Sequence, residues 1–190
     1  MSTTFAGVVL AGGQSKRFGS PKAFALRNGI PFYQYSIKAL TPLCRSITIV
    51  TRRELRHLFD KAGDTVQVIE DDPQIQGQGP LAGICSAMNA VKAEWFIVLP
   101  VDVPYIESRV IAKLTDSIDP AFEAIVPVVD ETIQPLVAIY HHSAAALVKT
   151  KLEADERSMH RLLSAAKVKY IDFEDKRPFM NVNRPKDMFI

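Results

Sequence analysis

The sequence predicts a three-layer α/β/α protein of Rossmann-like type, with helices on both faces of a mostly parallel sheet. Short β-branched or apolar runs alternate along the chain with stretches of helical period, as in repeated βαβ units. Several of these runs are apolar almost throughout, as strands are when helices cover both of their faces. The 190 residues suit one domain, 1–190, with a full hydrophobic core.

The expected elements follow one another without a linker or a repeat. The strands are expected at Phe5–Leu10, Ser46–Val50, Val66–Ile69, Trp95–Leu99, Ala124–Val128, Gln134–Tyr140 and Val168–Phe173. The helices are expected at Pro31–Leu40, Arg53–Ala62, Leu81–Val91, Ile106–Ser117, Ser143–Ala154 and Ser158–Ala165, and Pro31 and Ser143 suit helix starts. The first, fourth and fifth strands are the most continuously apolar, so we expect them at the centre of the sheet.

Composition excludes several classes of function. The chain has 23 Lys and Arg against 21 Asp and Glu, so it lacks the charge excess typical of nucleic-acid binding. Apolar runs such as Trp95–Pro100 fall far short of the ~20 residues that a membrane-spanning helix needs. The N-terminal segment has no charged region of a signal peptide, so we expect a cytoplasmic protein. Cys44 and Cys85 lack metal-ligand spacing and are expected as core residues.

Two long irregular segments stand out, Gly12–Lys22 and Asp71–Pro80. Each follows an expected strand, and long loops rich in Gly and Pro within a compact domain are usually functional. Because ligands of parallel α/β sheets bind at the carboxyl ends of the strands, we expect both loops to meet at one binding site.

The first loop has the composition of a phosphate-binding segment. Its glycines at 12, 13 and 19 allow backbone N–H groups to turn inward as an anion-binding nest, and Lys16, Arg17 and Lys22 add positive charge. The spacing matches neither the P-loop nor the dinucleotide-binding fingerprint. A plain turn with solvated cations is the structural alternative.

Resemblance to a known family narrows this interpretation. The run LAGGQSKRFG, followed by Lys22, resembles the signature of nucleotidyltransferases with the glycosyltransferase-A-like, nucleotide-diphospho-sugar transferase-like fold. Further segments, which together cover nearly the whole chain, resemble molybdenum cofactor guanylyltransferases: Val68–Asp72, Gly79–Gly83, Glu94–Ile106 and Phe179–Pro185.

The resemblance implies transfer of GMP from GTP to the terminal phosphate of molybdopterin, with Mg²⁺ as cofactor and pyrophosphate as the leaving group. It implies catalytic roles for Arg17, Lys22 and Asp102, with Asp102 as the metal ligand. It implies a GTP site formed by Leu10, Ala11, Gly12, Gly13, Lys22, Thr51, Asp71, Gly79 and Asp102. On the acceptor side it implies Asn181 and Asn183, to which Arg157 is added as a possible oxyanion contact.

Residue chemistry agrees with these roles but leaves alternatives open. Asp102 follows an apolar strand, and one carboxylate with phosphate oxygens and waters is a typical Mg²⁺ shell, although Asp also caps helices. The resemblance gives Asp71 guanine N–H groups or ribose hydroxyls to accept from, although Glu70–Pro73 also suits a solvated turn. Asn181 and Asn183 share a face of an extended segment, and otherwise suit a turn. Arg157 equally suits a solvated helix face.

Two residues depart from the family pattern. Pro21 stands before Lys22 where family members commonly carry Asp, and Thr51 stands where an Asn often contacts the nucleotide. Thr can hydrogen-bond but cannot reproduce an amide.

Two other functions remain as alternatives. A cytidylyltransferase for molybdopterin or another phosphorylated acceptor is one, although Ala11-Gly12-Gly13 favours guanine over the Ala-Ala-Gly of cytidine-specific relatives. A non-catalytic nucleotide-binding regulator is the other, although it would have little need for Asp102. The expected partners are GTP, molybdopterin, other cofactor-biosynthesis proteins and apo-molybdoenzymes, with no nucleic acid and no membrane.

Overall fold

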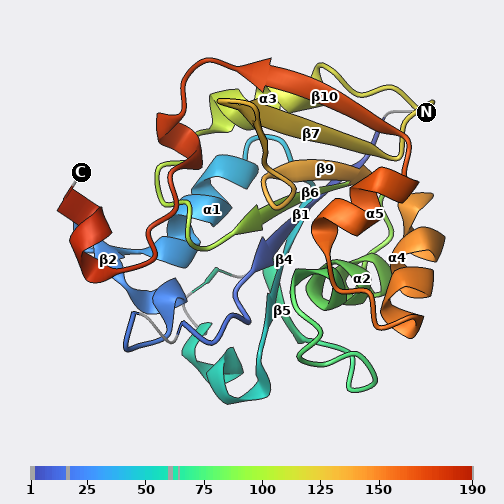
Figure 1. Ribbon diagram of the computed structural model, residues 1–190. Helices are drawn as coiled ribbons and strands as arrows, with labels where there is room; N and C mark the ends of the chain where they lie inside the picture. Colours follow the sequence, from blue (N-terminus) through green and yellow to red (C-terminus); the bar gives the residue numbers. More distant parts are fainter. Residues whose placement is uncertain (1–2, 16–17, 60–61, 64, 190) are drawn as a thin grey trace.

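The computed structural model describes residues 3–15, 18–59, 62–63 and 65–189, and its centre is an eight-stranded sheet (Figure 1). The strand order is β10-β7-β9-β6-β1-β4-β5, with β8 paired to β7. The strands are β1 Phe5–Leu10, β4 Ser46–Thr51, β5 Val66–Glu70, β6 Trp95–Pro100, β7 Ala124–Val129, β8 Thr132–Ile133, β9 Ala138–His141 and β10 Val168–Phe173. The pairs β1–β4, β1–β6, β4–β5 and β7–β10 are parallel, while β9 runs antiparallel to β6 and β7.

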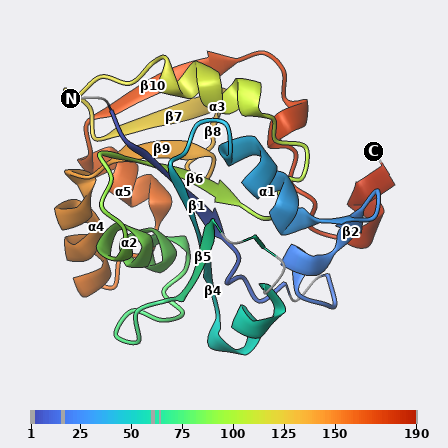
Figure 2. The same cartoon turned by 180° about the vertical axis from the view of Figure 1, so that it is seen from behind.

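Helices cover both faces of this sheet (Figures 1 and 2). The α-helices are α1 Phe32–Leu40, α2 Pro80–Ala90, α3 Ser108–Thr115, α4 Ala144–Glu153 and α5 Met159–Ala165. Short 3₁₀ helices are η1 Lys22–Phe24, η2 Arg53–Phe59, η3 Arg177–Phe179 and η4 Pro185–Phe189. Helices α1 and α3 lie on one face, and α2, α4 and α5 lie on the other. None of the helices in the described ranges has the length and apolar character needed to cross a membrane.

Adjacent residues of the central strands point into two separate cores. Val9 and Leu99 belong to the cluster on the α1 and α3 face, and Val8 and Val98 belong to the cluster under α2, α4 and α5. Because successive strand residues face opposite ways, a strand between two helix layers must be apolar at nearly every position. This explains the continuous apolar runs, and it gives the three-layer, mostly parallel fold that the sequence predicts.

Several expected elements differ from the observed ones. The expected strand Gln134–Tyr140 is a strand only from Ala138, because its first half forms a turn in which Val137 N–H donates to the carbonyl of Gln134. The expected helix Arg53–Ala62 is the 3₁₀ helix η2, and the α3 helix is shorter at both ends than expected. The fifth strand, β7, is buried but lies second from the sheet edge, because β9 inserts between it and β6.

A small hairpin beside the sheet was not expected. Strands β2 Leu26–Arg27 and β3 Ile30–Pro31 pair antiparallel across Asn28 and Gly29, whose φ angles are 51° and 75°. An Asn-Gly pair with two positive φ angles is the preferred two-residue hairpin turn. Pro31 then stands directly before α1, as Ser143 stands directly before α4, so both mark helix starts as predicted.

The core predicts how stability depends on the central strands. Ile97 of β6 is 0% exposed, so Ile97→Ala should lower the free energy of unfolding by about 2–5 kcal/mol through lost burial and a residual cavity. Tyr170 on the edge strand β10 is 48% exposed, so Tyr170→Ala should change it by less than about 0.5 kcal/mol. Urea denaturation of both variants checks this, and equal losses would contradict the assigned core.

Candidate active site

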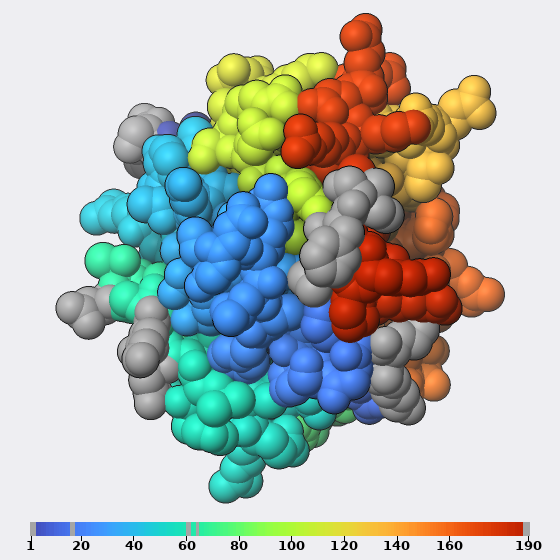
Figure 3. Space-filling model, turned by 90° about the vertical axis from the view of Figure 1, so that its left-hand side faces the viewer, coloured from blue at the N-terminus to red at the C-terminus, as the bar shows by residue number. Residues whose placement is uncertain are grey.

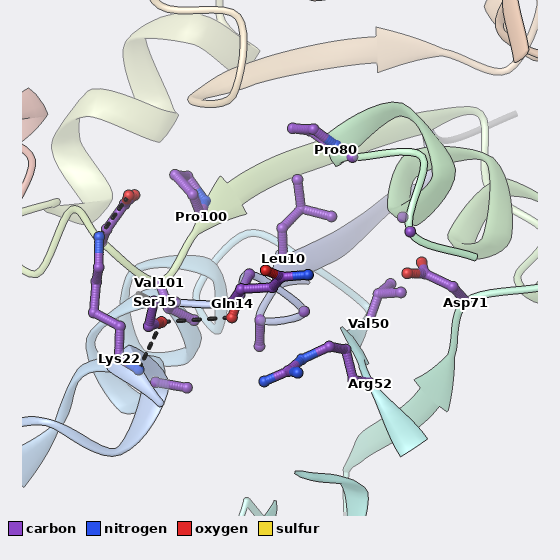
Figure 4. Close-up of a pocket in the computed structure, with 18 of the residues that line it drawn as sticks. Leu10, Gln14, Ser15, Lys22, Val50, Arg52, Asp71, Pro80, Pro100 and Val101 are labelled. Atoms are coloured by element: carbon purple, nitrogen blue, oxygen red, sulfur yellow. Dashed lines mark hydrogen bonds and ion pairs between the residues drawn. The ribbon is translucent and has the colours of Figure 1, made fainter. Parts of the chain in front are cut away.

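A cavity of about 490 Å³ lies at the carboxyl edge of the sheet (Figure 4). Its walls come from the segments that follow β1, β4, β5 and β6 and from the start of α2. Eight of the residues expected in the site line it: Leu10, Ala11, Gly12, Gly13, Lys22, Asp71, Gly79 and Asp102. The two long loops therefore meet at one place, as expected for strand ends of a parallel sheet.

Lys22 joins three distant segments of the chain. Its Nζ lies 3.2 Å from Asp102 Oδ2 and 2.9 Å from Asn183 Oδ1. The Lys22 side chain is only 12% exposed, so the ammonium group is held out of bulk water between two oxygen acceptors.

The C-terminal segment is held against this lysine by its backbone. Val182 N–H donates to the carbonyl of Asp102 at 2.8 Å, and Asp187 Oδ2 accepts from the N–H groups of Asn183 and Arg184. Val182 is buried with Phe32 in a small apolar cluster. Figure 3 shows the C-terminal segment, in red, against residues of the N-terminal quarter, in blue.

Local structure keeps Lys22 in place although Pro21 replaces the common Asp. Lys22 N–H donates to Ser15 Oγ at 3.0 Å, and Ser15 itself adopts a positive φ of 49°. Pro21 precedes η1, in which Phe24 N–H donates to the carbonyl of Pro21. The fixed φ of proline suits a helix start, so the turn forms without an acidic side chain at position 21.

Asp71 lies half-buried in the opposite wall of the cavity. Its Oδ1 is buried and has no hydrogen-bond partner in the described part of the chain. Burial raises the pKa of this carboxyl above its ordinary value. The backbone around it is fixed, since Asp72 N–H donates to Ser86 Oγ at 3.0 Å. A carboxylate oxygen so placed can accept a donor from a ligand.

The start of α2 brings its backbone next to Asp71. Gly79 has φ 76° and ψ −160°, a combination that essentially only glycine adopts, and Pro80 then opens the helix. A Cβ at Gly83 would lie 2.7 Å from Leu10 Cδ2 and 3.7 Å from Asp71 Oδ1. The absence of side chains at these positions lets the helix start approach the cavity closely.

Other expected site residues lie elsewhere. Thr51 is fully buried, and its hydroxyl donates to the carbonyl of Ala11 at 3.4 Å, so it supports the loop and does not face the cavity. Arg157 pairs with Asp155 at 2.7 Å in the connection between α4 and α5, and the cavity lining does not include it. Asn181 is exposed outside the cavity lining. Lys16 and Arg17 lie outside the described residues.

The structure also adds residues that the sequence interpretation missed. Arg52, the first residue after β4, lines the cavity, as do Ser15 and Glu54. The signal was available for Arg52, because it follows a strand just as Asp71 and Asp102 do. The expected strand ended one residue early, which assigned the site position to Thr51.

The oxygen donors around Lys22 suit a hard cation. Within the described ranges, no group of three or more His, Cys, Asp or Glu side chains could hold a metal ion. However, Asp102 Oδ2 and Asn183 Oδ1 both lie within 3.2 Å of the same Lys22 Nζ and are therefore close together. Mg²⁺ usually takes one or two protein carboxylates and completes its shell with phosphate oxygens and water, so this donor set fits it.

The raised pKa of Asp71 predicts a stability effect. A folded-state pKa above the ordinary 3.8 means that the stability contributed by protonated Asp71 is present below pH 3.8 and lost as the pH rises through the folded pKa. Asp71→Asn cannot ionise, so at pH 7 the ligand-free variant should have a Tm higher by roughly 2–4 °C for each kcal/mol relieved.

Calorimetry between pH 3 and pH 8 checks this effect, with the neighbouring Asp72→Asn as control. The gain for Asp71→Asn should disappear toward pH 3, and a lower Tm at pH 7 would contradict the prediction.

Comparison with known proteins shows the family to which the chain belongs. The model of the MobA-like NTP transferase domain matches residues 7–169. A probable molybdenum cofactor guanylyltransferase of Geobacillus sp. (strain WCH70) is 41% identical over 96% of this chain and 95% of its own. One of Bacillus cereus (strain AH187) is 36% identical over 96% of this chain and 93% of its own.

Solved structures show the same fold. Molybdopterin-guanine dinucleotide biosynthesis protein A of Archaeoglobus fulgidus superposes with a TM-score of 0.81 at 23% identity, over 97% of this chain and 95% of that chain. A nucleotidyl transferase of Methanothermobacter gives 0.76 at 15% identity, over 99% and 95%. With the domain match and the close relatives, these findings show that the chain is a nucleotidyltransferase and belongs to the MobA-like NTP transferase family.

Proposed function

We propose that this nucleotidyltransferase transfers GMP from GTP to the terminal phosphate of molybdopterin and releases pyrophosphate. The observation that carries the proposal is the position of Lys22 Nζ between Asp102 and Asn183, at the edge of the cavity lined by Gly12 and Gly13. This contact unites three segments that resemble molybdenum cofactor guanylyltransferases. The relatives with that name, at 36–41% identity over most of the chain, support the same reaction.

The cavity offers a place for each part of GTP. The guanine and ribose lie at the Asp71 and Gly79 end, where a carboxylate with an unpartnered oxygen and the close backbone of α2 supply acceptor and contact surface. The α-phosphate, which is next to the ribose, lies nearest Asp102 and Lys22, and the β- and γ-phosphates lie along the Gly12–Gly13 backbone of the same cavity. This orientation places the reacting phosphorus at the Lys22–Asp102–Asn183 contact.

Lys22 has a donor left for the substrate. An ammonium group carries three N–H donors, and Asp102 and Asn183 accept two of them. The third can reach a phosphate oxygen, and the lysine thereby positions the transferring group and offsets its charge. Arg17 joins it in this role by resemblance to the family. The attacking phosphate is already ionised near neutral pH, so the site requires no general base.

Asp102, with Asn183 beside it, would hold Mg²⁺. When bound there, the metal ion supplies charge neutralisation on the phosphate oxygens. Asp102 is 28% exposed and so is open to the cavity while its main chain is fixed by Val182. Asn183 therefore has two roles, because its amide oxygen holds Lys22 in place and also lies beside the carboxylate of Asp102 that would bind the metal ion.

The acceptor lies on the side of the C-terminal segment. Asn181 and Asn183 flank the buried Val182, so their side chains leave the backbone on the face that is not buried. Nothing in the position of Arg157 supports a contact with the acceptor. We propose that the enzyme acts in the cytoplasm, between the proteins that supply molybdopterin and the apo-molybdoenzymes that receive the product.

A pyrophosphate-release assay tests the proposal. With Mg²⁺ and molybdopterin present, GTP should support turnover and CTP should support much less, and neither should react without the acceptor. Release with CTP in preference to GTP would replace guanylyl by cytidylyl transfer. Silence with every nucleotide in the presence of molybdopterin would overturn the acceptor.

Loss of the metal carboxylate should abolish turnover. Asp102→Ala should lower kcat on the order of 10²-fold or more, because charge on the transferring phosphate is no longer offset. Asp116→Ala, an exposed change at the end of α3, should leave kcat unchanged. Thermal unfolding of both variants should match the parent protein within a few degrees, and full activity of Asp102→Ala would exclude Asp102 as the metal ligand.

A further inference from the structure

Arg52 lies at the carboxyl end of β4, between the strand ends that carry the glycine loop and Asp71. Its main chain is fixed, because Leu55 N–H donates to its carbonyl at 2.9 Å at the start of η2. Its Cγ lies 3.8 Å from where a Cβ at Gly12 would stand. The aliphatic part of the Arg52 side chain therefore runs against the first glycine of the loop.

The guanidinium of Arg52 has no partner in the described part of the chain. Its Nε is buried without a hydrogen bond, and it forms no ion pair there although Glu54 and Asp71 line the same cavity. Buried polar groups of folded proteins are almost always hydrogen-bonded, and an arginine carries five donors. Acceptors that come from a bound ligand would satisfy them.

The pairing of the charged side chains in the cavity leaves Arg52 available to an anionic ligand. Among the described residues that line it, Lys22 and Arg52 are the cations, and Glu54, Asp71 and Asp102 are the acids. Lys22 already faces Asp102, whereas Arg52 faces no acid. A planar guanidinium offers two parallel donors, which match two oxygens of a phosphate.

The direction of the Arg52 side chain indicates which part of the nucleotide it contacts. Figure 4 shows Arg52 extending from the end of β4 on the side of Gln14, in the glycine loop, and away from Asp71. In the proposed orientation of GTP, the base lies with Asp71 and the phosphates lie along the loop. Arg52 is therefore on the phosphate side of the cavity.

We propose that Arg52 binds the pyrophosphate portion of the nucleotide, with its guanidinium donating to oxygens beyond the α-phosphate. The proposal rests on the proposed function, since it takes the orientation of GTP from it. Arg52 supplies a cation to the group that leaves, in addition to Lys22 at the transferring group. Bound phosphate oxygens also satisfy the donors that are unpartnered in the free protein.

Binding of three ligands tests this role in the full chain with Mg²⁺. Arg52→Met keeps the length of the aliphatic stem and removes the donors, Arg52→Lys keeps the charge, and Arg53→Met removes an exposed neighbouring cation outside the cavity. Isothermal titration gives the Kd of each protein for inorganic pyrophosphate, GTP and GMP. Thermal unfolding shows whether each variant is folded.

We expect Arg52→Met to weaken the binding of pyrophosphate and of GTP by about 10- to 100-fold, the range expected for loss of charge-assisted hydrogen bonds. GMP, which lacks the β- and γ-phosphates, should change by less than about 2-fold. Arg52→Lys should lie between the parent and Arg52→Met, and Arg53→Met should bind all three ligands like the parent. If Arg52→Met does not fold, the same contrast between pyrophosphate and GMP is read from Arg52→Lys.

Two results would overturn the role of Arg52. Equal weakening of GTP and GMP binding would place the guanidinium on the base, the ribose or the α-phosphate, and unchanged pyrophosphate binding would remove it from the site. Pyrophosphate has no base, so this arm is independent of nucleotide choice. A parent protein that prefers CTP would contradict the proposed function while the pyrophosphate arm still decides the role of Arg52.

Discussion

The site depends on one constraint: the parallel strands β1, β4, β5 and β6 end at the same edge of the sheet and in register with one another. Leu10 pairs with Val50 on one side and with Pro100 on the other, and Thr51 pairs with Glu70. Because neighbouring parallel strands lie about 4.8 Å apart, the residues that follow these ends are close together whatever their separation in sequence. A glycine loop, an arginine and two aspartates are thereby gathered at one edge by backbone hydrogen bonds alone.

The C-terminal segment completes this edge from outside the sheet. It places an amide oxygen on Lys22 and a backbone donor on the carbonyl of Asp102, and Val182 secures it by burial with Phe32 and Tyr105. With Asp102 alone beside it, Lys22 would form an isolated ion pair. Asn183 is a neutral amide, so it holds Nζ in place without adding a second negative charge, and the positive charge of Lys22 stays available to an anionic substrate.

Sequence patterns predicted most of this fold because the two hydrophobic cores demand apolar residues at nearly every position of β1 and β6. They failed at strand ends, where apolar character does not distinguish a strand from a turn. Leu136 and Val137 of the expected strand Gln134–Tyr140 are apolar, yet the chain turns there because Val137 N–H donates to the carbonyl of Gln134. At the end of β4, the expected strand was one residue too short. Successive strand residues face opposite ways, so extending the strand to Thr51 turns that side chain into the core and brings Arg52 to the cavity.

Three buried polar side-chain atoms have no hydrogen-bond partner within the described part of the chain. They are Arg52 Nε, Asp71 Oδ1 and Gln78 Oε1. Arg52 and Asp71 line the cavity, and Gln78 lies between the lining residues Gly77 and Gly79. Such groups cost stability, and natural proteins retain them at sites that bind ligands. Their confinement to the ends of β4 and β5 and the start of α2 indicates that the free energy of nucleotide binding offsets the cost, with both a donor and an acceptor left for the ligand.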